Sequence, residues 1–69
     1  MNIGNSIRKF RQDRNISQEV LAFDCSISRS HMYKIESGRS SPTIRLLEKI
    51  AERMEVHVFE IIRHAETGK

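Results

Sequence analysis

Residues 17–38 read SQEVLAFDCSISRSHMYKIESG, and this stretch decides the fold. Ser17 and Ser28 each precede a segment in which apolar residues recur at helical spacing, and a serine hydroxyl can accept a hydrogen bond from an unpaired amide of a helix's first turn. The stretch therefore predicts two short helices with these serines as N-caps. A tight turn at 26–27 separates them, and the second ends before Gly38.

The apolar residues of this stretch predict how the two helices pack. Two helices that cross at a steep angle need a small residue where their backbones approach, and Ala22 is placed to be that residue. The positions expected to fix the pair onto the rest of the chain are Leu21, Cys25, Ile27, Met32 and Ile35. Cys25 is the only cysteine, so it has no disulfide partner in the chain and is interpreted as a core residue.

The outer face of the helix that follows Ser28 carries the functional prediction. With Met32 and Ile35 buried, a period of 3.6 residues turns a set of polar, non-acidic side chains outward: Arg29, Ser30, His31 and Lys34. A helix with such a face fits the major groove of B-DNA, where Arg or Lys donates to guanine and Ser or His reaches a base edge or a phosphate. These four residues are predicted to contact bases.

Helical spacing continues on both sides of the motif. A first helix is expected over residues 3–14 with Asn2 as its cap. Ser41 and Pro42 suggest the cap and first residue of a fourth helix, since proline lacks an N–H that would be unpaired there anyway. A fifth helix is expected over about 57–65, followed by a frayed tail at 66–69. The inward residues expected in these last two helices are Ile44, Leu47, Ile50, Ala51, Met54, Val58, Ile61 and Ile62.

Length and composition predict one all-α, five-helix domain over residues 1–65. The chain has 69 residues, 38% of them hydrophobic, with one proline and no run near the roughly 20 apolar residues that would cross a bilayer. With one cysteine and no secretory signal, a reducing cytoplasm fits best.

Residues 1–45 carry eight Lys and Arg against four Asp and Glu, so the basic half of the chain holds the motif. From charge alone, an ordinary solvated surface explains this excess as well as a binding surface does.

The chain resembles the lambda Cro and repressor-like, or XRE-like, helix-turn-helix family over nearly its whole length. The resemblance rests on the Ser17-Gln18 pair, Leu21-Ala22, the apolar turn residue Ile27 and the Ile-Glu-x-Gly at 35–38. It implies a five-helix domain, with the motif at about 17–37, that binds double-stranded DNA. The polar face described above and the family resemblance therefore both predict that a helix enters the major groove.

The resemblance also implies contacts beyond the base-reading helix. Gln18 matches a family glutamine that contacts the DNA backbone, and it opens a helix whose amides suit a phosphate. Ser37, Arg39 and Arg11 are further phosphate candidates, because such contacts set register without reading sequence. Arg11 and Glu36 also match positions that form an ion pair in the family.

Three positions depart from the family pattern. Ser26 and Glu55 stand where glycine is frequent. A left-handed backbone at Ser26 would cost about 1 kcal/mol or be relieved by a slightly different turn. Phe23 stands where a charged residue is usual, and no role is assigned to it. The short length and this aromatic residue are compatible with the restriction-modification controller proteins, a subgroup of the family.

Phe59 predicts a homodimer. It is rotated about 100° from Val58 and should be exposed in a monomer, whereas the family often has a polar residue there. A two-fold contact through Phe59 and Ile62, extended by Leu46, would set two base-reading helices about one DNA turn apart and require an inverted-repeat operator. A lone surface phenylalanine is the alternative.

The sequence argues against other classes of function. It shows no catalytic constellation, the three histidines are too scattered for a metal site, and no cofactor or small-molecule ligand is expected. A protein-interaction module or an antitoxin built on the same fold remains an alternative to a DNA-binding regulator. Whether such a regulator represses or activates stays open.

Overall fold

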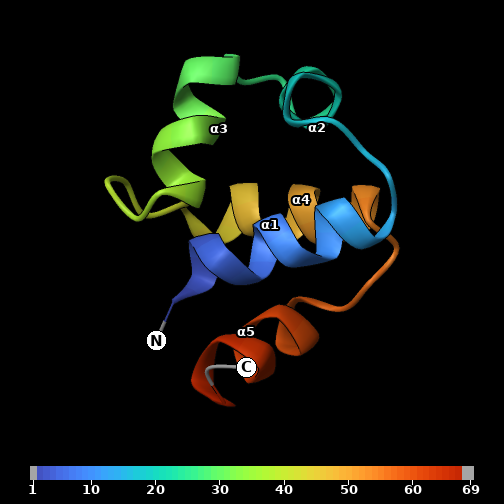
Figure 1. Ribbon diagram of the computed structural model, residues 1–69, viewed down its shortest axis with the longest axis vertical. Helices are drawn as coiled ribbons and strands as arrows, with labels where there is room; N and C mark the ends of the chain where they lie inside the picture. The colour runs from blue at the N-terminus through green and yellow to red at the C-terminus, as the bar shows by residue number, and fades with distance from the viewer. Residues whose placement is uncertain (1, 68–69) are drawn as a thin grey trace.

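The protein consists of five short helices, as the computed structural model shows for residues 2–67, the part of the chain that it describes (Figure 1). Their bounds are α1 Ile3–Asp13, α2 Gln18–Asp24, α3 Arg29–Glu36, α4 Ile44–Arg53 and α5 Val58–Thr67. The described residues contain no β-strand. The predicted all-α, five-helix fold is therefore confirmed.

The helices form three tiers around one core. The α2–α3 pair lies on one side of α1 and α4, and α5 lies on the other (Figure 1). Ile7 of α1, Leu21 of α2, Met32 of α3, Ile50 of α4 and Ile61 of α5 are fully buried, so every helix contributes to the same core. A hydrogen bond between Ser6 Oγ and His64 Nδ1, 2.7 Å apart, adds a polar tie between α1 and α5.

Four helices begin with the same type of N-cap. The side-chain oxygens of Asn2, Ser17, Ser28 and Thr43 each accept a hydrogen bond from the amide three residues later. Such a bond satisfies one of the four amides that a helix start leaves unpaired, and it contributes about 1 kcal/mol. The caps predicted at Asn2, Ser17 and Ser28 are confirmed.

The predicted start of α4 was wrong. Neither Ser41 nor Pro42 is its N-cap or first residue, because Thr43 is the cap and the helix begins at Ile44. Ile44, the first residue of α4, is 69% exposed instead of contributing to the core. The other predicted inward residues of α4, namely Leu47, Ile50, Ala51 and Met54, are buried.

Helices α1 to α4 all end in the same hydrogen-bonded turn. In each, the residue two beyond the last helical one adopts a positive φ, and the next amide bonds back five residues, as in Ile27 N to Ala22 O at 3.0 Å. The residues with positive φ are Asn15, Ser26, Gly38 and Glu55. Ser26 therefore adopts the left-handed backbone and not a different turn, and Glu55 does the same. Ile16, Ile27 and Val56 follow three of the residues with positive φ and pack against the core, which anchors those three turns.

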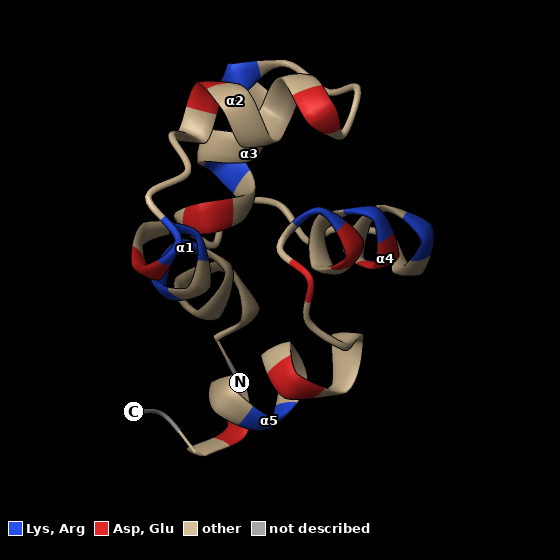
Figure 2. Ribbon diagram, turned by 90° about the vertical axis from the view of Figure 1, so that its right-hand side faces the viewer, with Lys and Arg blue, Asp and Glu red and all other residues tan. Residues whose placement is uncertain are grey.

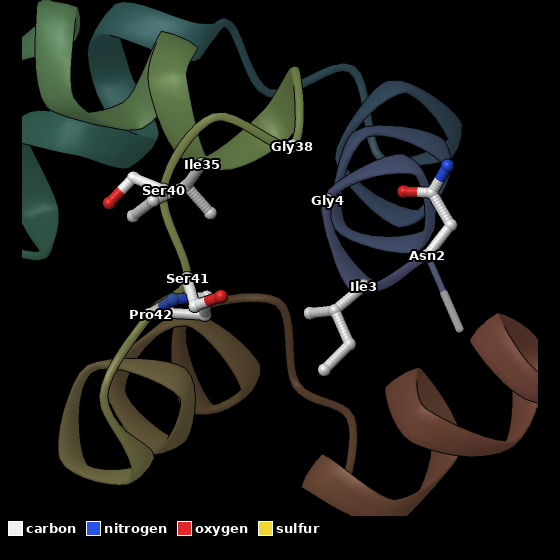
Figure 3. A pocket seen from close by; sticks show the side chains of 8 residues that line it. All are labelled: Asn2, Ile3, Gly4, Ile35, Gly38, Ser40, Ser41 and Pro42. Atoms are coloured by element: carbon white, nitrogen blue, oxygen red, sulfur yellow. The ribbon is translucent and has the colours of Figure 1, made fainter.

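Helix α1 crosses the end of α3 at very short distance, and Gly4 permits it. A Cβ on Gly4 would lie 2.2 Å from the backbone oxygen of Ile35 and 2.8 Å from that of Glu36. Beside this contact, the first turn of α1 and the loop after α3 enclose a hollow of about 270 Å³, with Ile3 and Pro42 on its walls (Figure 3). Gly4 thus fixes where the C-terminal end of α3 sits.

Candidate nucleic-acid interface

The outer face of α3 carries the predicted base-contacting residues. Arg29, Ser30 and Lys34 are exposed, while Met32 and Ile35 are buried, as the helical period predicted. His31 is only half-exposed. Position 31 lies about 40° around the helix axis from Ile35, so His31 flanks the buried face instead of standing opposite it.

Tyr33 belongs to this surface and was not predicted. Its side chain is 51% exposed, more than that of the half-buried His31. It follows Arg29 by four residues, so both lie on the flank of α3 that faces α1. That spacing was the signal in the sequence that could have identified it.

Arg11 and Glu36 form a buried ion pair between α1 and α3. Arg11 donates from Nε to Glu36 Oε2 at 2.7 Å and from Nη2 to Oε1 at 2.9 Å, a two-pronged geometry that fixes both side chains. The side chains are 10% and 3% exposed, respectively. Arg11 Nη1 also donates to the carbonyl oxygen of Ile16 at 2.9 Å. With all three nitrogens engaged and the side chain buried, Arg11 supports α3 and is not placed to contact a phosphate.

Gln18 joins the same network from α2. Its Nε2 donates to Glu36 Oε1 at 3.1 Å, so the side chain is held beside the ion pair while one amide N–H is left over. Arg39 and Ser37, the other phosphate candidates, are exposed just beyond α3. Ser37 Oγ donates to the carbonyl oxygen of Lys34, and the Arg39 amide bonds to the same oxygen. The structure thus brings Gln18 and Ser37 close to α3's polar face and keeps Arg39 in the adjoining loop.

Acidic and basic side chains are mixed elsewhere on the molecule. Figure 2 shows Lys and Arg alternating with Asp and Glu along α4, whereas the charged residues of α1 are three bases and one acid. Lys9 pairs with Asp13 within α1, and Arg53 pairs with Asp24 between α4 and the end of α2. On α3, by contrast, the exposed residues include no acid, because its one carboxylate, Glu36, is buried.

Cys25 lies in the core, as predicted, and is 1% exposed. Burial raises the pKa of its thiol above the ordinary value, and the neighbouring Asp24 carboxylate acts in the same direction. The thiol is therefore held in its protonated form. Within residues 2–67, no three His, Cys, Asp or Glu side chains are grouped as a metal site would require.

The residues predicted for the dimer surface differ in exposure. Phe59 is 61% exposed and Ile62, three residues later, is half-buried. Leu46 is also half-buried, and it packs against the core. Helix α5 also runs to Thr67, two residues past its expected end, so Glu66 and Thr67 are helical. The rest of the predicted tail lies outside the described residues.

Phe23 and Val20 form a second apolar surface, on α2. Phe23 is 81% exposed and Val20, one turn earlier, is 45% exposed. Both side chains thus lie on the solvent side of α2. Among the helices of residues 2–67, none combines the length and apolar character needed to span a bilayer.

Comparison with known proteins identifies the family. A profile of helix-turn-helix proteins matches residues 7–61. The control protein C.BamHI of Bacillus amyloliquefaciens is 30% identical over 66 residues, which cover 94% of this chain and 82% of that protein. The immunity repressor of Bacillus phage phi105 is 32% identical over 62 residues, covering 90% of this chain and 43% of the repressor. The chain therefore spans less than half the length of that relative.

Solved structures give the same result. The master regulator for biofilm formation SinR, in a crystal structure in complex with DNA, is 28% identical and superposes with a TM-score of 0.81 over 87% of this chain and 97% of the chain in that crystal structure. The resemblance drawn from the sequence motif is thereby confirmed. The chain belongs to the XRE-like helix-turn-helix (HTH_3) family.

Proposed function

We propose that this protein is a DNA-binding transcriptional regulator that inserts α3 into the major groove. The observation that carries the proposal is the composition of α3: its exposed residues are polar or aromatic without an acid, and Arg11 holds its one carboxylate inside the protein. The rigid attachment of α3 to α1 supports it, because base contacts require side chains held in fixed register. The SinR–DNA complex offers a template for the docking.

The side chains of α3 divide by position. Ser30 and Lys34 lie opposite the buried face and point into the groove, where Lys34 donates to guanine O6 or N7. Arg29 and His31 stand on the two flanks of this row, within reach of base edges or of the adjoining phosphates. Gln18, Ser37 and Arg39 contact the backbone on either side. Arg11 acts indirectly, through Glu36.

Substitutions on α3 should change sequence preference. Arg29→Ala or Lys34→Ala is expected to weaken binding by about 1–3 kcal/mol if the side chain makes a two-pronged base contact, and discrimination between base pairs should fall with it. Gln18→Ala and Arg39→Ala should weaken binding to all DNA sequences alike. Arg39→Ala should also lower the dependence of affinity on salt concentration.

The test is a selection of bound duplexes from random DNA, followed by gel-shift titrations of the four variants on the enriched duplex and a scrambled one. Unchanged affinity and preference in all four variants would contradict this placement of α3. A wild-type protein that enriches no sequence would favour a protein-interaction module or an antitoxin.

The regulator is proposed to act in the cytosol as a homodimer with Phe59 and Ile62 of α5 at the two-fold axis. These residues lie three apart, on the same side of α5, and Phe59 has no core to enter in the monomer. A self-complementary contact places two copies of α3 about 34–36 Å apart along the duplex. The operator is therefore expected to be an inverted repeat.

Phe59→Glu should convert the dimer to a monomer. Two carboxylates facing each other across the axis would be desolvated and repel, while α5 keeps Ile61 in the core. Sedimentation velocity should show half the wild-type mass, with unchanged helical content in circular dichroism and weaker operator binding. Phe23→Glu is the matched control, since Phe23 is even more exposed but lies on α2. A Phe59→Glu protein that still sediments as a dimer would place the interface elsewhere.

A further inference from the structure

A small notch opens where α1, α2 and α3 meet, beside the DNA-contacting face of α3. Its volume is about 160 Å³, and its walls are Arg8 of α1, Gln18 of α2, Tyr33 and Glu36 of α3, and Ser37 just beyond it. A single water needs only about 10–15 Å³ of such space. The notch is therefore large enough for a group of several polar atoms.

The charges around the notch favour an anion. Glu36 is negative, but both of its oxygens accept hydrogen bonds from Arg11, which also cancels its charge. Arg8 then supplies a net positive charge, because it is exposed and takes part in no ion pair within residues 2–67. A guanidinium group beside a neutralised pair attracts an anionic oxygen.

Three side chains at the notch can donate hydrogen bonds. The Gln18 amide, oriented by Glu36, retains one N–H, and the Tyr33 hydroxyl and the Arg8 guanidinium can each donate as well. The side chains come from three helices whose relative positions are fixed by the core and by the Arg11–Glu36 pair, and Gln18 is also held by its bond to Glu36. Such pre-organised donors match the unesterified oxygens of a phosphodiester.

We infer that this notch binds one phosphate of the DNA backbone, with Arg8 supplying the charge and Tyr33 a hydroxyl donor. The inference rests on the proposed function and assigns two residues that it leaves out. Tyr33 stands on the α1 side of α3 and not on its outermost row, and Arg8 reaches the notch from α1. From this flank, both side chains meet the strand that borders the groove, whereas base edges lie in front of Ser30 and Lys34.

The salt dependence of binding separates the two roles. On the duplex enriched by selection, Arg8→Gln should reduce affinity about tenfold and lower the slope of log K against log salt by about 0.9, the value for one phosphate contact. Tyr33→Phe should reduce affinity severalfold with the slope unchanged, because only a neutral donor is lost. Lys49→Gln is the control, since it removes one positive charge from α4, away from the notch.

Ethylation of single phosphates on the same duplex identifies the partner atom. One ethylated phosphate should weaken wild-type binding and have little further effect on Arg8→Gln. If wild-type protein binds but Arg8→Gln behaves like Lys49→Gln in both measurements, the notch holds no phosphate and only this inference is overturned. If the wild-type protein binds no duplex at all, the proposed function itself fails.

Discussion

Replacing Glu36 by leucine is expected to lower the free energy of unfolding by about 3–5 kcal/mol, a large part of the stability of so short a chain. The reason is the charge left behind. Arg11 is buried in contact with Glu36 Oε1 and Oε2 and would keep its positive charge without an opposite charge beside it. Arg11→Met should be similarly costly, because it strands the Glu36 carboxylate.

The double variant, Arg11→Met with Glu36→Leu, should be more stable than either single variant, because no desolvated charge remains. Urea titrations of the four proteins give the coupling energy, and circular dichroism establishes which of them fold. A coupling energy of zero would mean that the two side chains do not depend on each other. DNA affinity should not recover with stability, because α3 has lost the contact that fixes it to α1.

Gly4→Ala is expected to destabilise the protein by about 2–3 kcal/mol or more, although alanine is the better helix former. In an unobstructed helix this substitution is stabilising by about 0.5–1 kcal/mol. Here the added methyl would lie 2.2 Å from the backbone oxygen of Ile35, and a backbone atom cannot move aside without carrying α3 with it. The sign of the effect is therefore diagnostic.

Gly38→Ala is the matched control for this prediction. Gly38 has a φ of 84° but open space around its Cα, so alanine there should cost only about 1 kcal/mol, through backbone strain alone. Thermal unfolding of both variants measures the difference. A Gly4→Ala protein as stable as the wild type would show that α1 and α3 are not held so close, and the position of α3 would need another explanation.

The parts of the fold that sequence analysis predicted correctly depend on local chemistry. The caps at Asn2, Ser17 and Ser28 follow from a side chain and an amide three residues apart, a relation visible in the sequence itself. The same rule failed at α4, where Ser41, Pro42 and Thr43 all qualify to begin a helix. Because only the packing of Leu47 and Ile50 decides among them, the error could not be resolved locally.

The candidate site was predictable only in part, for a related reason. The helical period predicted correctly that Ser30 and Lys34 point outward. It also predicted this for His31, which lies beside the buried face and is only half-exposed. Arg11 was predicted both as a phosphate contact and as a partner of Glu36, and its sequence position could not distinguish them. The burial that decides for the ion pair arises when α1, α2 and α3 come together.

The left-handed residues just after α2 and α4 are positions at which a substitution could still raise the stability of the chain. Ser26 and Glu55 each hold a positive φ that glycine would adopt at about 1 kcal/mol less. Most substitutions cost about 0.5–3 kcal/mol, so a lineage that acquires glycine at these two turns can tolerate an otherwise harmful change on α3. Two residues outside α3 thereby influence how many destabilising substitutions α3 can accept.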